Sequence, residues 1–394
     1  LWLFKGWATD STATEAQYVP GGSYNGNGDQ TLYAVWGYPT GSCGDNATWT
    51  YKENGLYING TGAMTDYEND SSAPWHEYSD HIEAIHIDTG ITSIGNYAFA
   101  GCSKVASIEL PESITGMGQY VFSNCSTLES INIPAGVTAI NAYTFNNCKK
   151  LNIEKLPESV NTIGEYAFSG CESISALVLP DTITSIGTYA FSECSNLESI
   201  NIPQNVTVIE PYTFNGDTKL QNTVIPDSVV KIREFAFSQC SSITDVVIPK
   251  AVIEIERGTF SNCTSLKTAT IPDNVTTIGT SMFAYVKDNV TVKCYIDTAA
   301  YNYAKENEIN YELMPWGVLE KPTFSKVGII GGATISISAP KGKIYYTIDG
   351  SVPTEKSTLY EAPFNTKKNL TVKAIAVADG WSNSEVAEFE TGVT

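Results

Sequence analysis

The chain has 394 residues, and 23 Lys and Arg stand against 43 Asp and Glu, so its formal net charge is -20. This balance argues against a nucleic-acid partner, whose phosphates require a basic stripe, and no run of eighteen apolar residues is present that would span a membrane. The chain is too long for one ordinary hydrophobic core, so we expect several modules or a repeat array.

Residues 1–37 predict part of a small β module. Two aromatic segments, residues 4–8 and 32–36, flank a Gly-rich stretch, as expected for two strands around a flexible turn. The runs FKGWAT and TLYAVW resemble the C-terminal half of the internalin-type B-repeat, a β-grasp-like unit of bacterial surface proteins. Because the chain starts at Leu1, inside this module, we expect a fragment whose export signal and wall anchor lie outside the sequence.

Residues 38–90 predict an N-terminal β cap. Apolar segments at residues 49–51, 56–58 and 73–75 alternate with Gly and Asn turns and indicate short strands. A cap is needed because the outer face of a terminal repeat would otherwise expose the core.

Residues 91–289 carry an internal repeat of 23 residues. A constant period of this size is typical of a solenoid. Eight prolines and seven of the nine cysteines keep the same step. The clearest marker is a series of nine phenylalanines without insertion, namely Phe99, Phe122, Phe145, Phe168, Phe191, Phe214, Phe237, Phe260 and Phe283.

One copy, residues 127–149, indicates the course of a coil. Residues 130–133 alternate as a strand with Ile131 and Ile133 inward, and Pro134 ends the strand because it cannot donate to a ladder. Residues 137–140 predict a second short strand, and residues 143–148 at most one helical turn. A single coil buries too little apolar surface to offset the ordering of its backbone, so the coils must stack.

The pattern I-x-I-P-x-x-V-T-x-I-G-x-Y-A-F-S-x-C-S-x-L resembles the BspA-like leucine-rich repeat of bacterial surface proteins. This resemblance implies a β-rich leucine-rich-repeat solenoid of nine 23-residue coils with little helix. Glu154 replaces an inward Ile, and Asp217 and Val286 replace the repeat Cys. We therefore expect local irregularity near the third and sixth coils.

Two further modules follow the array. Residues 290–314 predict a C-terminal cap, in which a strand precedes a short helix with Asp297 as its N-cap. Residues 315–394 contain alternating strands at 334–338, 343–348 and 370–377 with Asp-Gly turns, a pattern typical of a β-sandwich. The run IYYTIDGSVPT resembles the chitobiase/hexosaminidase C-terminal-like module, which implies an immunoglobulin-like β-sandwich.

No catalytic or metal-binding pattern stands out, and we predict a protein that is not an enzyme and needs no cofactor. His76, His81 and His86 lie within eleven residues but at a spacing that does not obviously converge on zinc, so we favour surface histidines. The Asp-Gly pairs fit hairpin turns better than a calcium loop. No H-E-x-x-H, P-loop or G-x-S-x-G string occurs.

The repeat cysteines allow two interpretations. Equivalent Cα atoms of adjacent coils should lie about 4.8 Å apart, within reach of a disulfide. Free Cys, however, is commonly buried and packs as a small hydrophobe, which is the interpretation we favour. The residues concerned are Cys102, Cys125, Cys148, Cys171, Cys194, Cys240 and Cys263.

The outward strand positions supply the candidate binding residues. Valines at 178, 224 and 247 make the downstream half unusually apolar for an exposed sheet, and exposed apolar patches often mark partner sites. The alternative is that β-branched residues are simply good strand formers. The proposed binding residues are Val178, Asn201, Val224, Val247 and Thr270.

These observations predict a bacterial cell-surface or secreted protein that mediates adhesion by binding a host or microbial surface protein or a glycan. We expect it to be monomeric and extracellular, without a transmembrane segment in this sequence and without a nucleic-acid partner. Two alternatives stay open, an accessory binding region of a larger secreted hydrolase and a structural stalk.

Overall fold

The fold is taken from a computed structural model that describes residues 2–26, 28–221 and 224–393. The chain divides into two compact units, residues 1–269 with 277–290 and residues 270–276 with 291–394. No helix among the described residues is long and apolar enough to cross a membrane.

The N-terminal segment forms an antiparallel pair of strands, as predicted. Strand β1 (Leu3–Ala8) pairs with β2 (Tyr33–Gly37), and Phe4 lies opposite Trp36. The ring of Phe4 also packs edge-on against Trp7, with centroids 5.1 Å apart. The assignment of this pair to a B-repeat stays a prediction.

The cap region joins the repeat array through one mixed sheet. Strands β3 (Thr40–Gly44), β4 (Asn46–Lys52) and β5 (Gly55–Ala63) are antiparallel, whereas β5 pairs in parallel with β6 (Ala84–Ile87) and β7 (Gly90–Ile94). The predicted strand at residues 73–75 is wrong, because these residues turn into the 3₁₀-helix η1 (His76–His81). Pro74 has no N–H for a ladder, and Trp75 is buried, where its Nε1 donates to the Ala98 carbonyl at 2.8 Å.

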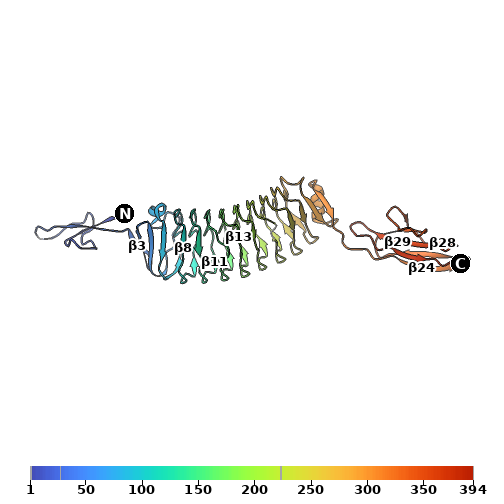
Figure 1. The fold of residues 1–394 in the computed structure, drawn as a ribbon, viewed down its shortest axis with the longest axis horizontal. Helices are drawn as coiled ribbons and strands as arrows, with labels where there is room; N and C mark the ends of the chain where they lie inside the picture. The colour runs from blue at the N-terminus through green and yellow to red at the C-terminus, as the bar shows by residue number, and fades with distance from the viewer. Residues whose placement is uncertain (1, 27, 222–223, 394) are drawn as a thin grey trace. The chain divides into compact units, whose positions relative to one another are not determined.

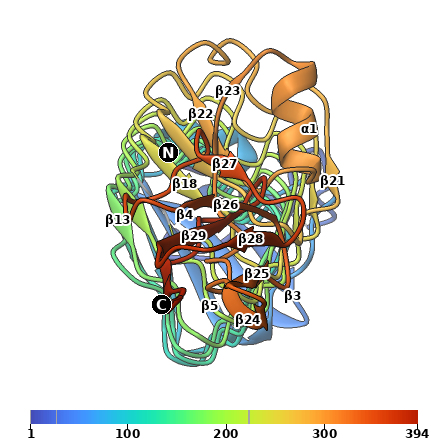
Figure 2. The ribbon, with the colours of Figure 1, turned by 90° about the vertical axis from the view of Figure 1, so that its right-hand side faces the viewer.

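The coils stack as predicted and form two columns of short strands (Figure 1). Partners in adjacent coils are parallel and 23 residues apart, as for Ile108 opposite Ile131. One column, called the strand face, contains β8 (Ser107–Glu109), β10 (Ser130–Asn132), β13 (Ala176–Leu177), β15 (Ser199–Ile200), β18 (Asp245–Val247) and β20 (Thr268–Thr270). Figure 2 shows β13 and β18 on one side of the coils and β21 on the opposite side.

The opposite column carries the second strand predicted in each coil. It contains β9 (Gly116–Met117), β11 (Ala139–Ile140), β12 (Thr162–Ile163), β14 (Ser185–Ile186), β16 (Val208–Ile209), β17 (Lys231–Ile232), β19 (Glu254–Ile255) and β21 (Thr277–Ile278). Each inward isoleucine faces its equivalent in the next coil, as Ile140 does Ile163. Parallel strand pairing therefore joins adjacent coils on both sides of the solenoid.

The repeat phenylalanines form a continuous buried stack. All nine are at most 1% exposed, and neighbouring ring centroids are 5.2 to 6.3 Å apart. A second, half-buried stack runs from Tyr97 to Phe235 with centroids 4.3 to 5.0 Å apart. Its residues adopt φ near +55°, and their N–H groups bond to the next coil, as Tyr120 does to the Ala142 carbonyl at 3.0 Å. Inter-coil hydrogen bonds and stacking thus offset an unfavourable backbone conformation.

The repeat cysteines are buried, as the packing interpretation predicted, and all nine cysteines of the chain are free. Six thiols each donate to the carbonyl of the phenylalanine 26 residues earlier, at 3.1 to 3.2 Å, as Cys148 does to Phe122. Burial raises the pKa of these thiols, to about 12 for Cys263. The column therefore packs as a ladder of weak S–H···O contacts.

The irregularity expected at the third coil is confirmed. Glu154 is exposed where other coils place a buried apolar residue, such as Ile108 or Leu177, and on the strand face this coil pairs with the next through an isolated bridge between Lys155 and Val178. In the sixth coil, which contains Asp217, residues 222 and 223 lie outside the described part of the chain.

The second unit begins with the C-terminal cap. Strand β22 (Thr291–Cys294) pairs in parallel with β23 (Asn310–Leu313), and α1 (Ala299–Glu306) connects them. The N-cap of α1 is Thr298 and not Asp297 as predicted. Thr298 has the extended backbone that an N-cap requires and its Oγ1 accepts the Tyr301 N–H at 3.4 Å, whereas Asp297 has a φ of +62°.

Residues beyond the cap form two antiparallel sheets. One contains β24 (Thr323–Ile329), β25 (Gly332–Ser338) and β28 (Phe364–Thr366), and the other β26 (Lys343–Thr347), β27 (Thr358–Leu359), β29 (Thr371–Val377) and β30 (Ala387–Glu390). Ile337 of the first sheet packs in one core with Ile344 and Val372 of the second. These contacts agree with the predicted β-sandwich.

Candidate functional site

A groove of about 680 Å³ lies on the strand face, beside β13 and β15. It brings together three of the predicted binding residues, Val178, Asn201 and Val224. Its lining is Ala176, Leu177, Val178, Glu198, Ser199, Ile200, Asn201, Ile202, Gln204, Gln221, Val224 and Pro226.

Two valines make the groove unusually apolar for a solvent-facing surface. Val178 is 61% exposed and Val224 is 80% exposed, and they occupy the same position two coils apart. Val247 is 66% exposed in β18 but does not line the groove, and Thr270 is half-buried and belongs to the second compact unit. The groove surface is therefore defined here by Val178 and Val224.

Asn201 has a structural task in the groove. Its Oδ1 accepts the Leu179 N–H at 2.7 Å and its Nδ2 donates to the Leu179 carbonyl at 2.8 Å, so the amide imitates a strand partner. Asn132 makes the same pair of bonds to Leu110. The signal in the sequence is Asn at the same repeat position three coils apart, whereas the sequence pattern by itself indicates only an outward position open to binding.

The lining of the groove carries little charge. Of the described residues that line it, only Glu198 has an ionisable side chain, while Gln204 and Gln221 offer neutral amides. These glutamines were missed from the sequence because they come from a turn and from the next coil. Apolar walls with a few polar groups are the chemistry that binding sites use to fix a partner's orientation.

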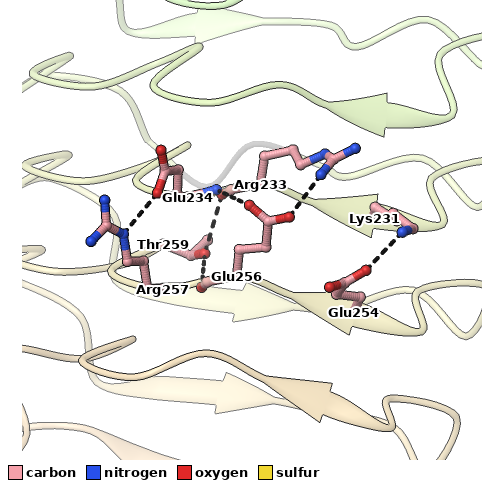
Figure 3. Close-up of polar contacts among 7 residues, drawn as sticks. All are labelled: Lys231, Arg233, Glu234, Glu254, Glu256, Arg257 and Thr259. Atoms are coloured by element: carbon pink, nitrogen blue, oxygen red, sulfur yellow. Dashed lines mark hydrogen bonds and ion pairs between the residues drawn. The ribbon is translucent and has the colours of Figure 1, made fainter.

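A cluster of charged side chains lies on the opposite column. Lys231 pairs with Glu254 at 2.8 Å, Arg233 with Glu256 at 2.9 Å, and Arg257 with Glu234 at 2.7 Å (Figure 3). Each pair joins one coil to the next, and each basic group already has a carboxylate partner. The cluster therefore ties adjacent coils together, with the modest stabilisation typical of partly exposed ion pairs.

The three histidines lie in two different elements, η1 and β6. His76 and His81 occupy the two ends of η1, whereas His86 stacks on Tyr57 with ring centroids 4.6 Å apart. Within residues 2–26, 28–221 and 224–393, no group of three His, Cys, Asp or Glu side chains is arranged to hold a metal ion.

Comparison with known families decides the identity of the array. The model described as the BspA type leucine-rich repeat region matches in six copies at residues 75–198 and 161–291, more than half of the chain. The chain belongs to the BspA-type leucine-rich repeat family. The repeat pattern and the stacked coils of this BspA-type array agree with that assignment. A second model, described as Fn3 associated, matches residues 334–391, within the β-sandwich.

Solved leucine-rich repeat proteins are similar to this BspA-type chain. One from Bacteroides ovatus is 26% identical, with 64% of this chain and 70% of that chain covered and a TM-score of 0.47. One from Eubacterium ventriosum is 22% identical, with 72% and 87% covered and a TM-score of 0.49. A leucine rich cell surface protein from Faecalibacterium prausnitzii is 19% identical, with 66% and 96% covered and a TM-score of 0.33. The comparison with curated proteins found no match.

Proposed function

We propose that this BspA-type protein is a non-enzymatic adhesion protein of the bacterial surface, and that its strand face binds a surface protein or glycan of a host or another microbe. The observation that carries the proposal is the groove at Val178 and Val224. A valine that loses its exposed area on binding contributes up to about 1.5 kcal/mol, so an apolar partner group would gain from entering the groove. The membership of the array in the BspA-type leucine-rich repeat family is consistent with the same role.

The first test is binding of the whole chain to an array of mucins, matrix proteins and polysaccharides. For each partner found, Val178→Lys with Val224→Lys should weaken binding at least about tenfold, because each change places a charge in the groove where apolar surface is buried on binding. Val327→Lys is the matched control, since Val327 is 63% exposed on β24 of the β-sandwich.

Three results would contradict the proposal. Unchanged affinity of the double variant would remove the strand face from the interaction. A loss confined to Val327→Lys would move binding to the β-sandwich, as expected of an accessory region of a hydrolase. If none of the mucins, matrix proteins and polysaccharides bound the chain, the alternative of a structural stalk would be favoured.

A further inference from the structure

Asp217 is a buried carboxyl in the column of thiols. It occupies the repeat Cys position of the sixth coil and has no exposed surface. Its main chain keeps the pattern of the column, since its N–H donates to the Phe214 carbonyl at 3.3 Å and its carbonyl accepts the Leu220 N–H at 3.0 Å. The side chain alone is therefore the exception.

The two carboxyl oxygens of Asp217 are in different situations. Oδ1 accepts the Cys194 N–H at 2.8 Å, whereas Oδ2 is buried without a hydrogen-bond partner. In the neighbouring coils the thiols of Cys194 and Cys240 donate to the carbonyls of Phe168 and Phe214. The equivalent acceptor for position 217 is the carbonyl of Phe191, 26 residues earlier, which receives no thiol hydrogen because this coil has no Cys.

We propose that Asp217 is held as the neutral acid, that its Oδ2–H takes the place of the missing thiol and donates to the Phe191 carbonyl, and that ionisation of Asp217 loosens the sixth coil and the groove beside it. A neutral acid satisfies both sites, because one oxygen accepts and the other donates. An ionised carboxyl has only acceptor oxygens and would leave a charged Oδ2 buried without a donor. Rising pH is thus expected to open this coil.

The surroundings of Asp217 favour the neutral form. Burial raises the pKa of Asp217 well above its ordinary value, and the negative charge of Glu193 acts in the same direction. The other titratable groups that face it are the thiols of Cys194 and Cys240, whose own pKa values burial also raises. The Cys194 N–H opposes these effects but contacts only one oxygen.

The link to the groove is short. The Leu220 N–H donates a hydrogen bond to the Asp217 carbonyl. The next residue, Gln221, lines the groove and donates its N–H to the Glu198 carbonyl at 3.1 Å. Val224 follows in the same coil. An effect of Asp217 on binding in the groove rests on the proposed function of the strand face. The opening of the sixth coil on ionisation of Asp217 does not depend on that function.

The sign of the pH effect follows from linkage. A carboxyl whose pKa is raised on folding makes its full contribution to the stability of the folded state below its unfolded pKa of about 3.9. That contribution is lost as the pH rises through the folded pKa. Between the two values, the equilibrium constant for closing the coil falls up to about tenfold per pH unit.

The test is hydrogen exchange of the whole chain from pH 5 to pH 9, corrected for the intrinsic rate and read by mass spectrometry. In the wild type, the opening constant of residues 210–221 should rise by at least about tenfold over this range relative to residues 118–148, which have Cys in the column. Asp217→Asn should abolish the rise, because its amide offers one acceptor and one donor. Asp217→Cys, which restores the repeat, should do the same.

A flat wild-type profile, or a rise that persists in Asp217→Asn, would overturn the proposal. This readout needs no partner, so it is independent of whether the strand face binds one. With a partner in hand, wild-type affinity should fall from pH 5 to pH 9 more than that of Asp217→Asn. Equal pH dependence of the two would overturn the control of the groove.

Discussion

Removal of the Asn201 side chain separates a structural role from a binding role. Asn201→Ala deletes two hydrogen bonds, of 2.7 and 2.8 Å, to the main chain of Leu179, a residue only 1% exposed. Each bond contributes about 1 kcal/mol net, and an N–H and a carbonyl are left unpaired. We expect the free energy of unfolding to fall by about 2 to 3 kcal/mol.

Urea unfolding followed by circular dichroism measures this loss. Asn132→Ala should cost a similar amount, because Asn132 makes the same two bonds to Leu110. Val178→Ala is the control within the groove, and at 61% exposure it should change stability by less than about 0.5 kcal/mol. If Asn201→Ala also stayed within that margin, the amide would not act as a strand partner, and Asn201 would return to the list of residues available for binding.

Two further outcomes follow from the core of the array. Phe191→Ala should lower the free energy of unfolding by about 3 to 5 kcal/mol in the same urea assay, because this unexposed ring stacks on Phe168 and Phe214, with ring centroids 5.4 and 5.8 Å apart. Tyr285→Ala is the control, at a residue that is 89% exposed. Equal losses in the two variants would contradict a stabilising role of the stack. In the native chain without reductant, iodoacetamide at pH 8 should leave all nine cysteines unmodified, because burial shields the thiols and raises their pKa. In guanidinium the chain unfolds, and the reagent should alkylate all nine free thiols. Fewer than nine adducts by mass in guanidinium would indicate disulfides.

The local errors of prediction have a common cause. Residues 73–75 have the composition of a strand, yet Trp75 packs on Phe99 at the end of the phenylalanine stack. Asp297 is a good N-cap by residue type, but its backbone is left-handed and Thr298 takes the position. In both places a contact or conformation set by the surrounding structure overrides local preference.

Much of the solenoid could be predicted from the sequence, because the period of 23 residues repeats one local pattern and each coil packs only on its neighbours. The buried phenylalanines, the inward isoleucines and the packing of the cysteines all follow from that period. The boundaries of the five predicted modules and the resemblances assigned to the two ends stay predictions.

Only the tertiary structure decided the details of the site. The groove between Val178 and Val224, the two bonds from Asn201 to Leu179, and the second oxygen of Asp217 each depend on atoms in different coils. A repeat pattern specifies which residue occupies each position, but it does not specify how a side chain that departs from the pattern is accommodated. That depends on the distances and hydrogen-bonding groups that stacking brings together.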